Sequence, residues 1–472
     1  MIKPDENLTK LLTPQQAWKY RTVPFGMTDN MLVVLCEVSN TIRNSNMLQV
    51  LLGHNITYKN IEKEELELIL NTYYFRNEST LAIRSEDAGS KGDFLSKVID
   101  ESLTCNASDI HFEVFGESCR IRFRIDGKLF TRFNLSIEKY PYVVNKIKIN
   151  SNLNISEKRL PQDGRMVIKV GNESIDVRVS TIPVSNGEKI VLRLLQSDAK
   201  KYQLNRIGFS DQQLRNVLKS IKKMQGIILV SGPTGSGKTT TLYSILNELN
   251  KPDVNILTVE DPVEYSINGI NQVQLKENVG LDYSTALRAF LRQDPDVIMV
   301  GEIRDEQTAE IAIRSALTGH LVLSTIHTNS ALGSIHRLMD MGLPAFLLSS
   351  TISMSIAQRL LRVLCPTCKR QIKVDESISS QYRDLLMDNE FYYEAVGCPE
   401  CFNTGYKGRT AVFEVVPFTG SMVNDFLKDY HDKPEKYLSG RNISSLQNQA
   451  IKLLRNGITS LDEISPILLS KI

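Results

Sequence analysis

The stretch ILVSGPTGSGKTTTLYSIL, residues 228–246, joins an apolar run to a glycine-rich loop and then to helix-forming residues. Residues 232–239 within it match the pattern G-x-x-x-x-G-K-[ST]. In a loop of this kind, backbone N–H groups converge on phosphate oxygens, and the positive end of the following helix adds to the attraction. We therefore predict a nucleotide-binding loop made by Gly232, Pro233, Thr234, Gly235, Ser236, Gly237, Lys238, Thr239 and Thr240.

The side chains of this loop indicate ATP and Mg²⁺ as its ligands. Lys238 can reach the β- and γ-phosphates as a point charge, and the hydroxyl of Thr239 can ligate magnesium. A chance match in a tight turn is the alternative. The strand pattern before the loop and the helix pattern after it are the context that the motif requires, and they favour nucleotide binding.

Apolar runs around the loop predict the fold of the second half of the chain. Short runs rich in Val, Ile and Leu occur at residues 226–232, 255–261, 296–302 and 320–328, and helical patterns separate them. Such runs indicate parallel strands that are covered on both faces. We predict an α/β domain from about residue 205 to residue 472.

The first half of the chain has other patterns. Within residues 94–198, a helical segment precedes strands that alternate polar and apolar residues, with Asp126-Gly127 as a turn signal, so we predict an α+β domain. Residues 1–88 indicate a small helical or mixed module. The polar stretch at 84–93 is a predicted linker, and residues 197–210 are a predicted hinge.

Carboxylates stand at the ends of two predicted strands. Glu260, Asp261 and Glu264 belong to one group, and Glu302 ends the other run. Ligands bind beyond the carboxyl ends of parallel strands, so we expect these acids near the loop. Each acid alone would more often be a solvated loop residue, but two clusters together favour a role in hydrolysis. Glu302 is our first choice for the base, Glu264 is the second, and the other acid would hold magnesium through its water shell.

The cysteines predict a metal site. Two pairs, CPTC and CPEC, fit a tetrahedral zinc site with no open position, and the zinc would therefore be structural. A redox dithiol usually needs only one such pair. The predicted ligands, in a zinc subdomain at 365–401, are Cys365, Cys368, Cys398 and Cys401. The other cysteines are predicted to be buried thiols: Cys36, Cys105 and Cys119.

Composition limits the classes of function. A chain of 472 residues exceeds what one core usually supports, which predicts two or three domains. The net charge of +2 gives no argument for nucleic acid or for an anionic membrane surface. No apolar run reaches the roughly 18 residues of a spanning helix, and no secretory signal is evident. We expect a cytoplasmic protein that reaches a membrane only through partners.

A longer segment resembles a known family. LRQDPDVIMVGEIRD, residues 291–305, resembles the signature of the ATPases of bacterial type II secretion and type IV pilus assembly, the GspE and PilB group. Other stretches agree with this resemblance, which covers about residues 94–415: ASDIHFE (107–113), RFRIDGKL (122–129), LPQDGRM (160–166), LTGHLVLSTIHTNSA (317–331), AQRLLR (357–362) and the two cysteine pairs.

The resemblance implies a fold and a set of roles. It implies a hexameric ring of RecA-like domains, in which a PAS-like domain at 94–198 closes on the nucleotide. The family's aspartate box falls on residues 260–264, its Walker B acid on Glu302 and its histidine box on His320 and His327. Its tetracysteine insertion is typical of secretion and pilus-extension ATPases. The arginines that correspond to nucleotide-directed arginines of the family are Arg165, Arg178, Arg288 and Arg292.

Elementary chemistry is consistent with these roles. An arginine that enters late stabilises the negative charge of phosphoryl transfer. Arg288 and Arg292 are four residues apart and would share one face of a helix. His320 and His327 flank a buried strand and could sense the γ-phosphate by hydrogen bonding. The alternatives are solvated surface arginines and structural histidines.

Two functions compete at this stage. The first is a hexameric ATPase that drives the assembly of pilin-like subunits through an inner-membrane platform and its cytoplasmic adaptor, with residues 1–88 as a possible platform-docking module. The second is a RecA-like motor that translocates nucleic acid, as in DNA uptake or conjugation. The near-zero net charge favours the first. Salt-sensitive binding of single-stranded DNA would favour the second.

Overall fold

The computed structural model describes residues 94–195 apart from 117, 171 and 172, residues 203–374, residues 391–469 apart from 420, 421 and 431–433, and parts of 4–85. Residues 86–93 of the predicted linker and 197–202 of the predicted hinge lie outside the described residues. The chain forms two compact units, one of residues 1–87 with 130–134 and one of residues 88–129 with 135–472.

The first unit is built on a small mixed sheet. Strand β2 is antiparallel to β1 and parallel to β3, and its apolar sequence MLVVLC supplies Leu32, Val34 and Leu35 to the core of the unit. Strand β4 pairs in parallel with residues 133 and 134 of the same unit. The bounds are α1 (Glu6–Thr9), β1 (Thr22–Thr28), β2 (Met31–Cys36), β3 (Ile56–Asn60) and β4 (Arg84–Ser85).

The second unit begins with a helix and an antiparallel sheet. Buried residues alternate with more accessible ones in β6 and β10, whereas β5 is buried almost throughout; the strand order is β7-β6-β5-β10-β9-β8, and residues 130–134 of β7 belong to the first unit. Asp126 and Gly127 connect β6 to β7 with φ values of 47° and 86°, which suit a tight hairpin turn. The bounds are α5 (Phe94–Thr104), β5 (Asp109–Phe115), β6 (Ser118–Ile125), β7 (Lys128–Ser136), α6 (Tyr140–Asn150), β8 (Gln162–Val170), β9 (Glu173–Val184) and β10 (Gly187–Leu195).

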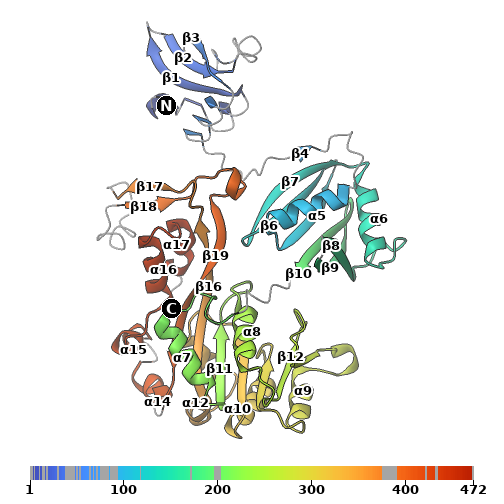
Figure 1. The fold of residues 1–472 in the computed structure, drawn as a ribbon, viewed down its shortest axis with the longest axis vertical. Helices are drawn as coiled ribbons and strands as arrows, with labels where there is room; N and C mark the ends of the chain where they lie inside the picture. Colours follow the sequence, from blue (N-terminus) through green and yellow to red (C-terminus); the bar gives the residue numbers. More distant parts are fainter. Residues whose placement is uncertain are drawn as a thin grey trace. The chain divides into compact units, whose positions relative to one another are not determined.

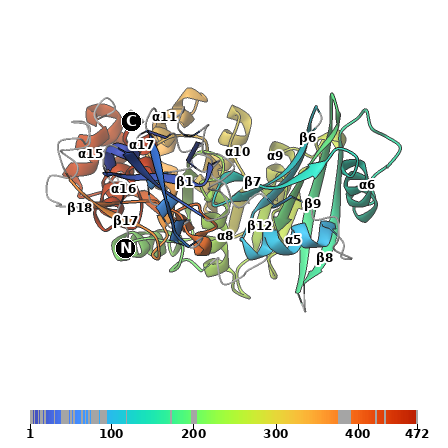
Figure 2. The ribbon, with the colours of Figure 1, turned by 90° about the horizontal axis from the view of Figure 1, so that it is seen from above.

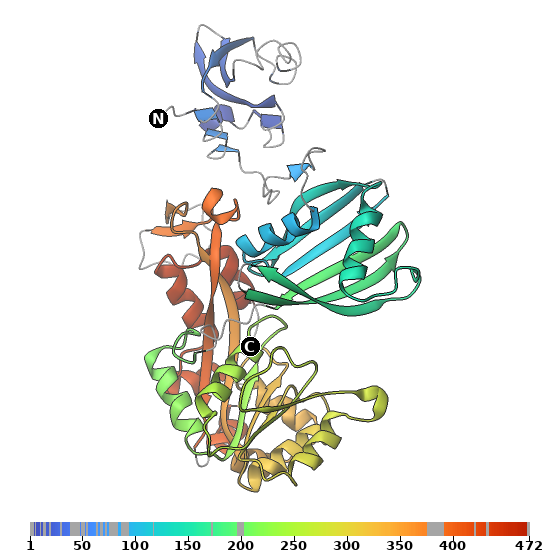
Figure 3. The same ribbon diagram turned by 45° about the vertical axis from the view of Figure 1, so that its right-hand side comes forward.

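Helices α5 and α6 lie against this sheet (Figure 2, Figure 3). Most of their buried residues, such as Val98 of α5 and Ile147 of α6, are apolar, as are the alternate residues Ile110 and Phe112 of β5, whereas the buried Lys148 of α6 pairs with Glu188 of β10. The other alternate positions of β5 carry Asp109, His111 and Glu113. The amphipathic pattern of the strands therefore separates an apolar helix-covered face from a charged face.

A second sheet of seven strands follows, in the order β13-β12-β14-β15-β11-β16-β19 (Figure 1). All neighbouring strands are parallel except β19, which is antiparallel to β16. Its strands are β11 (Gly226–Ser231), β12 (Ile256–Glu260), β13 (Asn271–Gln274), β14 (Val297–Val300), β15 (Leu321–Ile326), β16 (Ile352–Leu364) and β19 (Tyr406–Pro417). Its helices are α7 (Asp211–Ile221), α8 (Lys238–Leu249), α9 (Tyr283–Phe290), α10 (Glu306–Leu317), α11 (Gly333–Asp340) and α12 (Ala345–Thr351).

This sheet is buried on both faces, as predicted. Ile227 and Leu229 of β11 belong to one apolar core together with α10, whereas Ile228 and Val230 belong to another together with α8. Successive side chains of a strand point to opposite faces, so a continuous apolar run needs two cores. The predicted α/β fold with a parallel sheet is confirmed.

Strands β16 and β19 form a long hairpin whose far end carries a small two-stranded sheet (Figure 1). Helix α16 packs on both long strands. The remaining bounds are β17 (Arg370–Lys373), β18 (Phe391–Glu394), α14 (Met422–Asp425), α15 (Pro434–Gly440), α16 (Leu446–Arg455) and α17 (Leu461–Leu469). Within the described ranges, every helix is too short or too polar to cross a bilayer.

Candidate functional site

The glycine-rich loop lies between β11 and α8, at the carboxyl end of the parallel strands. Gly237 precedes the helix with φ 87°, a left-handed conformation that residues with a Cβ rarely adopt. A Cβ at Gly232 would lie 2.6 Å from the carbonyl oxygen of Gln358 on β16. Both glycines are therefore required by the shape of the loop and by its packing on the neighbouring strand.

The loop presents donors that fit phosphate. The ammonium of Lys238 folds over the loop and donates to the carbonyls of Gly232 and Pro233 at 2.9 and 3.2 Å. Ser236 Oγ is buried and has no hydrogen-bond partner, and the side chain of Thr239 is exposed. A buried polar atom without a partner is costly unless a ligand satisfies it. The residues therefore fit an anionic group with an accompanying cation.

Burial lowers the pKa of Lys238, while the negative charge of Glu302 acts in the opposite direction and the positive charge of Arg359 adds to the lowering. These interactions identify Glu302 and Arg359 as the charged neighbours of the lysine. The ammonium is partly desolvated, so its attraction to a phosphate is stronger than at an exposed position.

Glu302 and His327 meet beside the loop. Glu302 follows β14 and His327 follows β15. Because these two strands are parallel neighbours, their carboxyl ends lie side by side. His327 Nε2 lies 3.2 Å from Glu302 Oε2, and the other carboxylate oxygen contacts Arg304. The side chain of Glu302 is only 15% exposed. The structure thus brings together three predicted residues, Lys238, Glu302 and His327.

Glu260 lies deeper than the other acids. It is buried, and its carboxylate accepts hydrogen bonds from Tyr243, from Thr258 at 2.7 Å and from Gln272 at 3.1 Å. Tyr243 belongs to α8, the helix that follows the loop. Glu260 therefore ties that helix to the sheet, and its oxygens are already engaged.

Glu264 faces Arg178. Arg178 Nη1 donates to Glu264 Oε2 at 3.3 Å, and Nη2 donates to the carbonyl of Val263. Arg165 on β8 stands directly opposite Arg178 on β9. Like charges directly opposite each other are unfavourable in a sheet. The two arginines therefore form a local cationic site, of which Arg178 engages the aspartate-box segment of the same chain.

Three predicted residues lie at the opposite edge of the sheet. The carbonyl of His320 accepts the N–H of Gly226 at 3.1 Å, at the start of β11, whereas the phosphate loop follows the end of that strand. Six residues of strand span roughly 20 Å. Arg288 and Arg292 are exposed at the end of α9, and the next residue, Gln293, accepts from Asn255 just before β12. The structure does not bring these residues to the loop of their own chain.

A sequence model described as Type II/IV secretion system protein matches residues 84–466. The chain belongs to this family. Two curated relatives agree. It is 43% identical over 387 residues to the type II secretion system ATPase E of Vibrio cholerae serotype O1, covering 81% of this chain and 76% of that protein. It is 38% identical over 492 aligned positions to the type IV pilus assembly ATPase PilB of Myxococcus xanthus, covering 98% and 86%.

A solved structure of the ATPase DotB of Legionella pneumophila has the same fold. It superposes with a TM-score of 0.60 at 22% identity, and the alignment covers 82% of this chain and all of that one. The family match and the two curated relatives confirm the resemblance to secretion and pilus ATPases, and the shared fold agrees with the α/β core that the resemblance implied.

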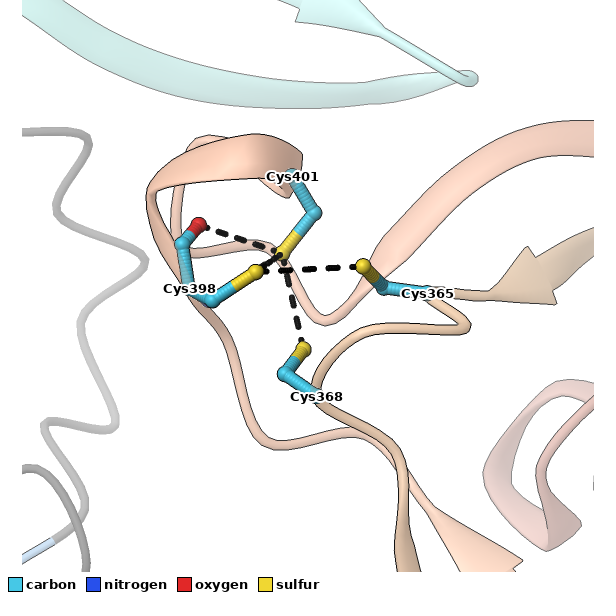
Figure 4. A group of neighbouring side chains, drawn as sticks. All are labelled: Cys365, Cys368, Cys398 and Cys401. Carbon is cyan, nitrogen blue, oxygen red and sulfur yellow. Dashed lines mark hydrogen bonds between the residues drawn. The ribbon is translucent and has the colours of Figure 1, made fainter.

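The four paired cysteines of this type II/IV secretion family member converge (Figure 4). The Sγ atoms of Cys365 and Cys398 are 3.8 Å apart, and those of Cys368 and Cys401 are 3.7 Å apart. These separations are too long for disulfides and match the edge of about 3.8 Å of a tetrahedron with Zn–S bonds of about 2.3 Å. Backbone N–H groups of Gly397 and Gly405 point at two of the sulfurs at 3.3 Å.

This cluster fits zinc, and its place in the chain gives it a structural position. Cys365 directly follows β16, and Cys401 shortly precedes β19. A metal held by the cluster would clamp the end of the long hairpin. The remaining cysteines, Cys36, Cys105 and Cys119, are buried thiols outside any disulfide, as predicted.

Two residues beside the loop were not predicted from the sequence. Arg359 of β16 donates to Asn329 O at 3.0 Å and lies next to Gly232. Gln358 Oε1 accepts a hydrogen bond at 2.7 Å from the hydroxyl of Thr241, which belongs to α8, the helix that follows the loop. Both belong to AQRLLR, which the sequence marks only as a family segment, so nothing in its pattern indicated that it borders the nucleotide loop.

Proposed function

We propose that this protein is an ATPase that works as a ring of six copies and couples ATP hydrolysis to the assembly of pilin-like subunits, in type IV pilus extension or type II secretion. The observation that carries the proposal is the convergence of Lys238, Glu302 and His327 at one edge of a parallel sheet. The names of the two curated relatives support the coupling to secretion or pilus assembly.

Each residue at this edge has a chemical task. Lys238 attracts the phosphates, and the loop N–H groups with Ser236 would hold their oxygens. Thr239 and the nearby acids would hold Mg²⁺, which neutralises the phosphate charge when it is bound. Glu302 accepts a proton from the attacking water, and His327 orients the carboxylate through its 3.2 Å contact.

Glu302 is a better candidate for the base than Glu264. Glu302 is mostly buried and is the acid that acts on Lys238, whereas Glu264 is 38% exposed and paired with Arg178. Glu260 is engaged by Tyr243 and its neighbours, which supports a positioning role for it. Glu264 would instead pair with Arg178 when the α+β region at 94–198 brings Arg178 and Arg165 toward the nucleotide.

The position of three predicted residues supports the proposed ring. If Arg288, Arg292 and His320 act on nucleotide, they must act on the nucleotide of a second copy, because their own loop lies at the other end of the strands. Repeating such a head-to-tail contact generates a ring when the rotation between copies closes, and we propose that it closes here at six copies. The platform and adaptor proteins of an inner membrane would be the partners of this ring, with residues 1–88 as the docking module and the zinc subdomain at 365–401 as a rigid part of the domain at 205–472.

Lys238→Ala tests the nucleotide assignment. We expect hydrolysis to fall to background and the affinity for ATP to drop, because the variant removes the charge that contacts phosphate without opening a core cavity. Turnover is measured with the full-length protein, and folding is checked by thermal unfolding. Lys251→Ala, on an exposed turn after α8, is the matched control. Wild-type turnover in Lys238→Ala would refute the assignment of the loop.

Zinc is tested by metal analysis and by Cys398→Ser. We expect about one zinc ion per chain in protein purified without chelator, and its loss in the variant. Loss should increase proteolysis between residues 365 and 401 and leave ATP affinity within about threefold of wild type, because the loop is held by β11 and α8. Cys119→Ser should keep the metal. Protein free of zinc as purified would contradict the four-cysteine site.

A further inference from the structure

Glu414 is a buried carboxylate that has no task in the hydrolysis described above. It lies on β19 opposite Ala357 of β16 and is only 1% exposed. Its Oε1 accepts the N–H of Ala331 at 2.9 Å, and its Oε2 accepts the N–H of Leu446 at 3.4 Å. Burial raises its pKa, while these N–H donors and Arg359 act in the opposite direction. A group so buried is retained only with its polar partners in place.

One of these partners lies in the loop that begins with His327. This histidine loop, residues 327–332, connects β15 to α11. It is held at three further points: Ser355 donates to the carbonyl of Ala331 at 2.7 Å, Arg359 donates to that of Asn329 at 3.0 Å, and Ser231 donates to that of Ser330 at 3.4 Å. Of these four side chains, Glu414 is the one that lies on β19.

The second partner belongs to the C-terminal helices. Leu446 is the first residue of α16, and Ser445 caps that helix. The two oxygens of one carboxylate thus join the histidine loop to the start of α16. A shift of α16 would move the carboxylate or break one of its bonds, and the histidine loop would lose a fixed point.

We propose that Glu414 is a positioning residue for ATP hydrolysis. It holds the histidine loop so that His327 stays against Glu302, and it makes this placement depend on helix α16. The inference rests on the proposed ATPase function and deepens it, because it supplies a route by which a partner bound to the C-terminal helices would change turnover. Glu414 contacts neither the phosphate loop nor Glu302, so it acts through the loop.

Glu414→Gln provides the test. The amide keeps the size of the side chain but has one acceptor oxygen, so one of the two N–H groups would face an NH₂ group. We expect kcat to fall roughly 10²-fold, because a displacement of about 1 Å in an oriented catalytic group can cost about that factor in rate. KM for ATP should change by less than about threefold. Amide hydrogen exchange in residues 327–332 should accelerate about tenfold.

Glu463→Gln is the matched control. Glu463 accepts the N–H of Arg362 at 3.0 Å and Nη2 of the same residue at 2.6 Å, and so joins α17 to β16. This carboxylate is also mostly buried and also joins a C-terminal helix to the hairpin, through one backbone N–H and one guanidinium, and its hydrogen bonds go to β16 and not to the histidine loop. We expect a similar decrease in the unfolding midpoint with nearly wild-type kcat. An equal loss of kcat in both variants would mean that Glu414 is only structural.

A double-mutant cycle with His327→Ala tests the route. In single-turnover measurements, Glu414→Gln should lower the rate of the His327→Ala protein by less than about threefold, because residues that act as a unit are not additive. If the losses of rate in the two single variants multiply in the double variant, Glu414 acts by a route that does not involve His327, and the proposal is wrong. A wild-type protein without ATPase activity would instead defeat the proposed function, whereas an active wild type with a fully active Glu414→Gln variant would defeat only this inference.

Discussion

Glu302→Gln is expected to bind ATP with nearly wild-type affinity and to hydrolyse it 10²- to 10⁴-fold more slowly, on the order of what general-base removal costs. The amide preserves the shape of the side chain and can still accept a hydrogen bond from Arg304 or His327. It cannot accept a proton from water. Binding is measured with a fluorescent ATP analogue, and turnover is measured by phosphate release from the full-length protein.

Glu264→Gln is the control that separates the two candidate bases. Glu264 is 38% exposed and bound to Arg178, so the amide should weaken that contact and lower turnover by less than tenfold, about the scale of one exposed ion pair. If Glu264→Gln lost more activity than Glu302→Gln, the roles of the two acids would have to be exchanged. Loss of ATP binding in Glu302→Gln would indicate that Glu302 is needed for the structure of the site.

The sequence predicted well what depends on short segments. The phosphate loop, the parallel strands and the Asp126-Gly127 turn follow from local patterns, because residue spacing, glycine conformation and apolar period act within a few residues. The convergence of the cysteine pairs was also predictable, since tetrahedral zinc leaves few other arrangements for them. The pairing of Glu302 with His327 follows once two strands are known to be parallel neighbours.

Other parts of the site depend on contacts distant in sequence. Glu414 meets Ala331 across 83 residues and Arg178 meets Glu264 across 86, and no local pattern encodes such a contact. The position of His320 could have been judged from the sequence. It precedes the strand that His327 follows, and a six-residue strand places its ends at opposite edges of the sheet. The family motif joined both histidines in one box and so obscured this distance.

The second large effect concerns the arginines at the far edge. Arg288 and Arg292 lie near the amino ends of the parallel strands, whereas their own phosphate loop lies at the carboxyl ends. Their action on nucleotide therefore requires a neighbouring copy. We expect the double variant Arg288→Ala, Arg292→Ala to lose roughly 10³-fold or more of its turnover, which is the scale of a missing arginine finger, and to keep ATP binding. Arg314→Ala, an exposed arginine on α10 that pairs with Glu310, is the control and should stay active.

Mixing inactive subunits distinguishes action on a neighbour from action within one chain. The Lys238→Ala protein lacks a working phosphate loop but keeps both arginines, whereas the arginine variant has the reverse defect. In a randomly mixed ring with equal amounts of each, about one quarter of the head-to-tail contacts join an intact loop to intact arginines. Turnover should therefore recover well above that of either variant alone. A mixture that exchanges subunits, as seen by energy transfer between labelled copies, and yet stays at background would show that the arginines do not act across the contact.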